Sequence, residues 1–99
     1  MTKTINKQTF ENINNKIFEI LFDSENPTSC ELIEIKGINT QTVKEGLPEP
    51  FSLVFQAAGD TIFEQNTYFV KNNEFKKTPL FLVPIGSDEK GVRYEAIFT

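Results

Sequence analysis

Histidine and tryptophan are missing from this 99-residue sequence, and cysteine and methionine each occur once. Without histidine, the catalytic triads, dyads and proton shuttles that depend on an imidazole are excluded. Zinc sites built on histidine are excluded as well, because the single Cys30 cannot replace those ligands. The five glycines stand apart from one another, so the chain has no glycine-rich phosphate-binding loop.

Basic residues are also few, since ten Lys and Arg stand against fourteen Asp and Glu, giving a net charge of −4. Duplex binding relies on neutralising phosphates with Lys and Arg, and here only Lys76 and Lys77 are adjacent. We therefore expect no nucleic-acid partner. Nothing approaches the roughly twenty apolar residues of a membrane helix, and residues 1–15 lack the apolar centre of a signal peptide. We expect no membrane partner and a cytoplasmic location, with Cys30 as a small buried hydrophobe.

Aromatic residues, in contrast, are abundant: ten Phe and two Tyr favour a packed β-protein over a disordered chain. The stretch 50–56, Pro-Phe-Ser-Leu-Val-Phe-Gln, predicts the central strand. Phe51, Leu53 and Phe55 share one face by the two-residue period of a strand, and three large side chains on one face require a core that other strands cover.

The alternation of apolar residues and the spacing of turn residues predict one β-rich domain over residues 1–99. We expect a mainly β fold, a small antiparallel barrel or sandwich of six or seven strands with one short N-terminal helix. The helix is predicted at 7–14, and the strands at 16–22, 29–36, 51–57, 67–72, 80–85 and 92–98. A short additional strand at 61–63 is an alternative, and 37–49 is predicted to be a long polar connection.

Signals at the helix ends are specific. Asn6 is predicted as the N-cap, and Ile5 and Phe10 have the spacing of a hydrophobic staple. Phe10 and Ile13 form a short apolar stripe, so the helix should dock on the body and close one end of the sheet. Asn15 is predicted to end the helix, because asparagine tolerates the left-handed conformation.

Three strands carry irregular patterns. In 16–22, apolar residues on both faces predict a strand partly covered on both sides, by the helix for example. In 29–36, the alternation breaks at Leu32-Ile33, which a β-bulge explains. In 80–85, the run Leu-Phe-Leu-Val predicts a strand covered on both faces, and Pro84 predicts a sheet edge or strand end because it cannot donate to a ladder.

Candidate chemistry is weak. Glu31 and Glu34 are a possible acid–base pair, although solvated strand positions explain them better. Tyr68 and Tyr94 are possible rim residues of a site, or boundary residues whose hydroxyls are hydrogen-bonded. The loops at 23–26 and 87–91 supply oxygens without the spacing of a calcium loop. We predict no catalytic, cofactor-binding or metal-ligating residue, and no cofactor.

Several motifs occur in order along the chain: Phe10-x-x-Ile13-x-Asn15-x-x-Phe18, PFSLVF at 50–55, Gln65-x-Thr67-Tyr68-x-Val70, FLVPIG at 81–86 and YEAIF at 94–98. Together they resemble a bacterial family of small single-domain proteins classed as a domain of unknown function. The resemblance spans Phe10 to Phe98. Family members tend to have Gly at the position of Asn15 and often His at that of Asn72. The resemblance implies no known activity, cofactor or catalytic residue.

Two functions are compatible with these observations. The first is a non-enzymatic protein-binding or assembly module whose edge strands accept a protein partner, either a second copy or another chain. The second is a small-ligand carrier or a carboxylate-based enzyme, with its site at a barrel mouth lined by Phe and Tyr.

Overall fold

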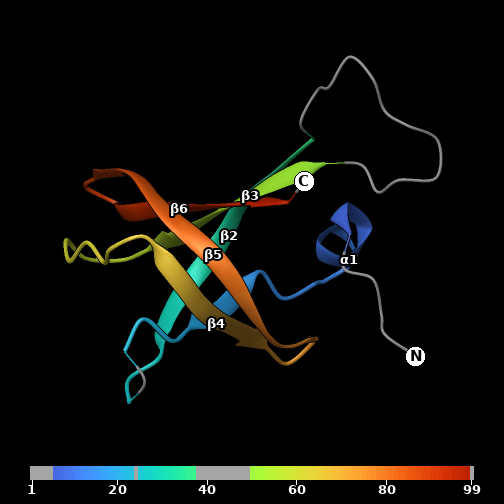
Figure 1. Ribbon diagram of the computed structural model, residues 1–99, viewed down its shortest axis with the longest axis horizontal. Helices are drawn as coiled ribbons and strands as arrows, with labels where there is room; N and C mark the ends of the chain where they lie inside the picture. Colours follow the sequence, from blue (N-terminus) through green and yellow to red (C-terminus); the bar gives the residue numbers. More distant parts are fainter. Residues whose placement is uncertain (1–5, 24, 38–49, 99) are drawn as a thin grey trace.

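Six antiparallel strands close into a barrel in the order β1-β2-β3-β6-β5-β4, with β4 pairing back to β1 (Figure 1). This computed structural model describes residues 6–23, 25–37 and 50–98. The expectation of a mainly β antiparallel fold with one short helix is confirmed, and the closed order decides between barrel and sandwich.

Most element positions were predicted to within a few residues. The elements are α1 (Lys7–Glu11), β1 (Ile17–Ile20), β2 (Thr28–Gly37), β3 (Phe51–Ala57), β4 (Asn66–Asn72), β5 (Phe75–Asp88) and β6 (Gly91–Phe98). The alternative strand at 61–63 is not formed. The predicted connection at 37–49 lies, apart from Gly37, outside the described residues.

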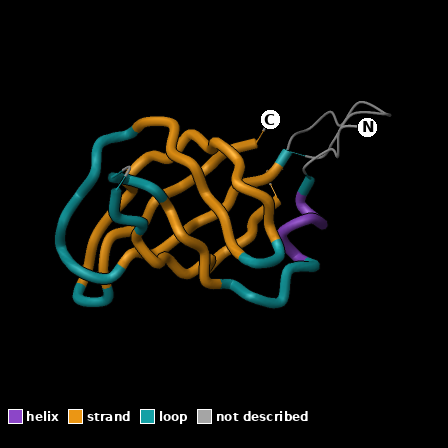
Figure 2. Tube along the Cα trace, turned by 90° about the horizontal axis from the view of Figure 1, so that it is seen from below, coloured by secondary structure: helices purple, strands orange, loops and turns teal. Residues whose placement is uncertain are grey.

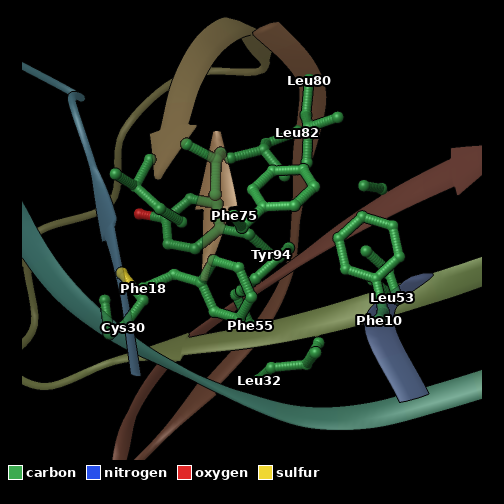
Figure 3. Close-up of a cluster of buried hydrophobic side chains, with 14 of the residues drawn as sticks. Phe10, Phe18, Cys30, Leu32, Leu53, Phe55, Phe75, Leu80, Leu82 and Tyr94 are labelled. Carbon is green, nitrogen blue, oxygen red and sulfur yellow. The ribbon is translucent and has the colours of Figure 1, made fainter. Parts of the chain in front are cut away.

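The central strand was predicted correctly in both its bounds and its inward face. Phe51, Leu53 and Phe55 are buried with at most 1% of their surface exposed. Phe55 lies opposite Leu32 of β2 on one side and Tyr94 of β6 on the other. Figure 3 shows the cluster that these strands enclose, in which the Phe18 ring lies 5.4 Å from that of Phe55 and 5.8 Å from that of Phe75. Strand alternation therefore fills the barrel interior with large apolar side chains.

The bulge predicted in 29–36 is present. The pairing of β2 with β3 shifts between Leu32 and Glu34, so that Ile33 is the extra residue. Leu32 stays buried inside the barrel, whereas Ile33 is 42% exposed on the outside. A bulge bends and twists its strand, and this one keeps the apolar face of β2 directed inward along its whole length.

The predictions for the fifth strand are wrong in two respects. It starts at Phe75 rather than at 80, because Phe75, Thr78 and Pro79 pair with β4 instead of lying in a loop. It is also not covered on both faces: Leu80 and Leu82 are buried, whereas Phe81 is 53% exposed. An uninterrupted apolar run does not by itself say what lies on its outer side.

Pro84 also does not lie at an edge or at a strand end. It lies within β5, opposite Tyr94 of β6, where the register shifts between Pro84 and Gly86. The β-bulge accommodates a residue without an N–H. Residues of β5 up to Leu82 pair with β4, and those from Val83 onward pair with β6. One long strand thus passes from one neighbour to the other, which helps to close the barrel.

Helix α1 closes one end of the barrel, as predicted (Figure 2). Asn6 caps it: the Asn6 side chain accepts a hydrogen bond from the Thr9 N–H at 3.0 Å, and the Thr9 hydroxyl accepts one from the Asn6 N–H at 3.2 Å. Phe10 and Ile13 are buried in the core. The predicted staple with Ile5 lies outside the described residues.

The helix ends earlier than predicted and without a left-handed residue. Its C-cap is Asn12, with φ −83° and ψ −12°, and no described residue other than glycine has a positive φ. Asn15 instead holds the helix exit to the β4–β5 turn, donating from its side chain to Asn73 at 2.8 Å. The Asn15 carbonyl accepts from the side chain of Asn72 at 2.8 Å, so Asn72 also holds the helix exit to this turn.

The first strand was predicted to be covered on both faces for part of its length, by the helix for example, and at Ile17 this prediction is wrong. Phe18 and Ile20 are fully buried, but Ile17 is half-exposed on the outer side. The reason is the position of α1: it lies at the end of the barrel, where Phe10 touches Phe18, and not along the outside of β1.

Candidate functional site

The two glutamates considered as a catalytic pair lie on the outside of the barrel. Because the bulge adds Ile33 between them, Glu31 and Glu34 both point outward instead of to opposite faces. Both are exposed, and they pair with Gln56 and Val54 of β3. This is the solvated arrangement that the sequence favoured over an acid–base pair.

The two tyrosines gather at the end of the barrel opposite α1. The ring of Phe22 lies between them, 4.8 Å from Tyr68 and 4.7 Å from Tyr94. Phe63, from the loop between β3 and β4, stacks on Phe22 at 4.5 Å with an interplanar angle of 4°. Aromatic rings therefore occupy both ends of the barrel interior, with Phe10 at one end and Phe63 at the other.

Both tyrosine hydroxyls are used to hold that loop. Tyr94 accepts a hydrogen bond from the Phe63 N–H at 3.0 Å, and Tyr68 donates to the Glu64 carbonyl at 2.6 Å. Burial raises the pKa of both hydroxyls, and the nearby Glu64 charge adds to the effect at Tyr68. Both hydroxyls are hydrogen-bonded, as the alternative interpretation of the sequence expected. Tyr68 is half-buried at the boundary, whereas Tyr94 is fully buried in the core.

Cys30 is buried in the core with a free thiol. Burial raises its pKa to about 12, so at neutral pH it carries almost no thiolate, the reactive form. Its Sγ lies 3.6 Å from the Thr28 carbonyl. The sequence interpretation of Cys30 as a small buried hydrophobe is confirmed.

The oxygen-rich loops satisfy their own groups. In the 87–91 turn, Asp88 accepts from the Lys90 N–H at 2.8 Å and from Arg93 at 2.6 Å, and these bonds hold its pKa below the usual range. In the 23–26 turn, Asp23 accepts from the Glu25 N–H at 3.0 Å. Over residues 6–23, 25–37 and 50–98, no three potential metal ligands gather at one point. In the same part of the chain, no helix has the length and apolar character that a membrane crossing requires.

The outer surface of the β4–β5 pair carries the most concentrated exposed apolar side chains. Phe69 of β4 lies directly opposite Pro79 of β5, and Thr67 directly opposite Phe81. Phe69 and Phe81 are therefore diagonal neighbours on one face, a spacing that aromatic side chains can bridge. Phe69 is 46% and Phe81 53% exposed. Pro79 between them is also exposed, so the three side chains form one apolar strip.

Three lysines adjoin this strip at a second bulge. The register of β4 with β5 shifts so that Lys71 lies opposite the two residues Lys76 and Lys77. The Lys77 ammonium group stands 4.8 Å from the centre of the Phe69 ring, within the range of a cation–π contact. Lys71 lies 3.8 Å from Glu19, but both side chains are nearly half-exposed, so water weakens this pair. We call this surface the basic aromatic face: Phe69, Lys71, Lys76, Lys77, Pro79 and Phe81.

Sequence analysis missed this face. It showed only that Lys76 and Lys77 are adjacent. It did not place this Lys pair in β5, because it predicted that this strand begins at residue 80. The available signal was the alternation Lys77, Pro79, Phe81, which a strand would place on one side.

The chain belongs to the family described as Domain of unknown function (DUF6916), whose model matches residues 5–98. The resemblance to a domain of unknown function is thus confirmed over nearly the whole chain. Among curated proteins and among solved structures, no match was found.

Proposed function

We propose that this member of the family is a non-enzymatic protein-binding module, and that its partner docks on the basic aromatic face. The observation that carries the proposal is the pair of half-exposed rings, Phe69 and Phe81, on one outward face of the β4–β5 ribbon. The partner that fits is a protein surface or segment with apolar side chains beside carboxylates.

The apolar part of the face supports docking because it is not needed inside the barrel. The barrel core is formed by the inward side chains, and Phe69 and Phe81 are not among them. Each ring exposes about half of the roughly 200 Å² that a Phe side chain offers, so covering one contributes about 2.5 kcal/mol at most. Two such rings can anchor a partner, since aromatic side chains dominate the energetics of interfaces.

The charged part of the face specifies the chemistry of the partner. The chain is acidic overall, yet three lysines lie on the same face as Phe69, and among the described residues only Glu19 opposes them within salt-bridge distance. Such a local reversal of charge attracts acidic groups and repels basic ones, which gives specificity and faster association.

We do not propose that a partner binds by pairing with an edge strand. In the closed order each described strand already pairs with two neighbours. The alternative of a ligand carrier or carboxylate enzyme at the barrel mouth has less support. Phe22, Phe63 and the two tyrosines occupy one end, and both tyrosine hydroxyls are engaged. A cytoplasmic location stays part of the proposal, supported by the buried free thiol of Cys30.

Site-specific photocrosslinking in the native cell tests the proposal. The photoreactive residue p-benzoylphenylalanine replaces Phe81, and in a matched control it replaces Ile62, which is 59% exposed on the loop before β4. Mass spectrometry of the products then identifies the crosslinked peptides. We expect products from position 81 only, each mapping to a segment with Asp or Glu beside apolar residues.

The proposal also requires that the product depend on charge. Adding Lys77→Glu to the position-81 variant should reduce crosslinking severalfold, because it places a carboxylate beside Phe69. Equal products from positions 81 and 62, no product from position 81, or products that map to basic or nucleic-acid partners would each contradict the proposal.

A further inference from the structure

A second patch on the barrel has the opposite charge. The bulge in β2 places Glu31, Ile33 and Glu34 together on the outside, all three exposed. Glu34 lies opposite Val54 of β3, and Val54 in turn lies opposite Glu95 of β6. Two glutamates thus stand on either side of Val54, with Ile33 exposed beside Glu34. Val54 itself is buried, with 6% of its surface exposed, so a partner would meet the glutamates and Ile33 around it. We call Glu31, Ile33, Glu34 and Glu95 the acidic face.

The basic residues near the acidic face are too few to neutralise its glutamates. Lys36 lies two residues beyond Glu34 along β2, and it pairs across to Ser52. Arg93 lies opposite Gln56, but its guanidinium group is 2.6 Å from the Asp88 carboxylate. Three glutamates therefore face one free lysine within the described part of this surface. The composition mirrors the basic aromatic face, where three lysines and an apolar strip face one glutamate.

The centres of the two faces lie on opposite sides of the barrel, while Glu95 of β6, which pairs with Val83 of β5, lies between them. In the closed order, β3, at the centre of the acidic face, is three strands away from β4 in either direction. In the same way, β2 is three strands away from β5. Figure 1 shows β4 and β5 crossing in front of β2. One copy therefore cannot use both faces on the same neighbour.

We infer that the partner of the basic aromatic face is a second copy of this chain, which docks there with its acidic face. This inference rests on the proposed function and names its partner. Carboxylates at positions 31, 34 and 95 meet lysines at positions 71, 76 and 77, and Ile33 packs against the aromatic strip. The contact is heterologous, and opposite faces that pair in this way extend into open chains unless the rotation between copies closes a ring.

Sedimentation velocity of the full chain tests this inference, at low ionic strength and up to near-millimolar concentration. The wild-type mass should rise with concentration and pass beyond two copies. Phe81→Asp blocks the basic aromatic face and Glu34→Lys blocks the acidic face, and both positions are exposed. Each variant alone should associate at least about tenfold more weakly than wild type. Ile62→Asp, outside both faces, should behave like wild type.

The decisive sample is an equal mixture of the two blocked variants. Each keeps one intact face, so the mixture should form complexes of two chains and stop there. Raising the salt concentration should weaken these complexes, since exposed charges are screened. Circular dichroism establishes that each variant is folded, and Lys77→Glu and Glu31→Lys serve as a second pair if one of the first is not.

Three results would overturn the inference: a wild-type chain that stays single, a wild-type mass that levels off at two copies, or a mixture that stays single. These results are distinct from failure of the proposed function. If the wild type stays single while position 81 crosslinks an acidic segment of another protein, the docking face holds and the second copy is wrong. If position 81 gives no product above Ile62, the docking face itself is wrong.

Discussion

Replacing Phe10 with alanine tests whether the short helix is part of the core. The Phe10 side chain is completely buried and is surrounded by four other Phe rings. Its centroid lies 5.1 Å from that of Phe75 and 5.8 Å from that of Phe98. Phe→Ala substitutions in cores cost about 3–5 kcal/mol, through lost burial and the cavity left behind. The lost contacts with neighbouring rings are part of that total cost, so we expect about 4 kcal/mol.

That loss is large for a chain of this size. Domains have total stabilities of about 5–15 kcal/mol, so Phe10→Ala should remove a quarter of the stability or more. A helix of five residues cannot persist without packing, so its residues should also lose their protection from hydrogen exchange.

Urea unfolding followed by circular dichroism measures the effect. With a slope of about 1–1.5 kcal/mol per molar urea, the midpoint should fall by roughly 3–4 M. Gln8→Ala is the matched control, because Gln8 is exposed in the same helix and alanine favours helices; its effect should stay within about 0.5 kcal/mol. A loss below about 1 kcal/mol for Phe10→Ala would refute the conclusion that this ring closes the barrel.

Two further predictions follow from buried polar groups. Because burial raises the pKa of Cys30 from 9.0 to about 12, the free energy of unfolding should be unaffected by this thiol below pH 9 and should fall as pH rises from 9 toward 12, by about 1.4 kcal/mol per unit. Cys30→Ala should reduce that slope in urea titrations, and an equal slope in both proteins would contradict the pKa. Tyr94→Phe should cost about 1–2 kcal/mol, because it leaves the part-buried Phe63 N–H without its acceptor. Tyr68→Phe, which loses an exposed bond, should cost less, and equal costs would show that burial does not set the difference.

The inward side of the fold was predictable because alternation reports it directly. In β3, the alternate residues Phe51, Leu53 and Phe55 are large and apolar, and all three are buried. The break of alternation at Leu32-Ile33 predicted the bulge, since only an extra residue keeps both Leu32 and Ile35 directed inward.

The outer side was predicted poorly, for an equally physical reason. A strand pattern tells which residues share a face, but not whether another element covers that face. The run from Leu80 to Val83 reads the same whether Phe81 is covered or exposed, and in the structure it is half-exposed. The prediction of a sheet edge or strand end at Pro84 was wrong for a related reason. A proline, which lacks the N–H, fits at a bulge as well as at an edge, and here it lies at a bulge.

Recognising the basic aromatic face requires two things: which residues the strand register makes neighbours, and whether another element covers them. For this reason the face emerged only from the structure. Phe69 and Phe81 are 12 residues apart in the chain, and pairing makes them neighbours. The bulge that brings Lys71 opposite Lys76 and Lys77 is likewise a property of register, not of composition. A polar residue at an outward position of a closed barrel does not weaken the core. Thr67, exposed opposite Phe81, is an example. Two Phe rings at such positions expose apolar area that contributes nothing to the interior, and the proposed docking would remove that area from water.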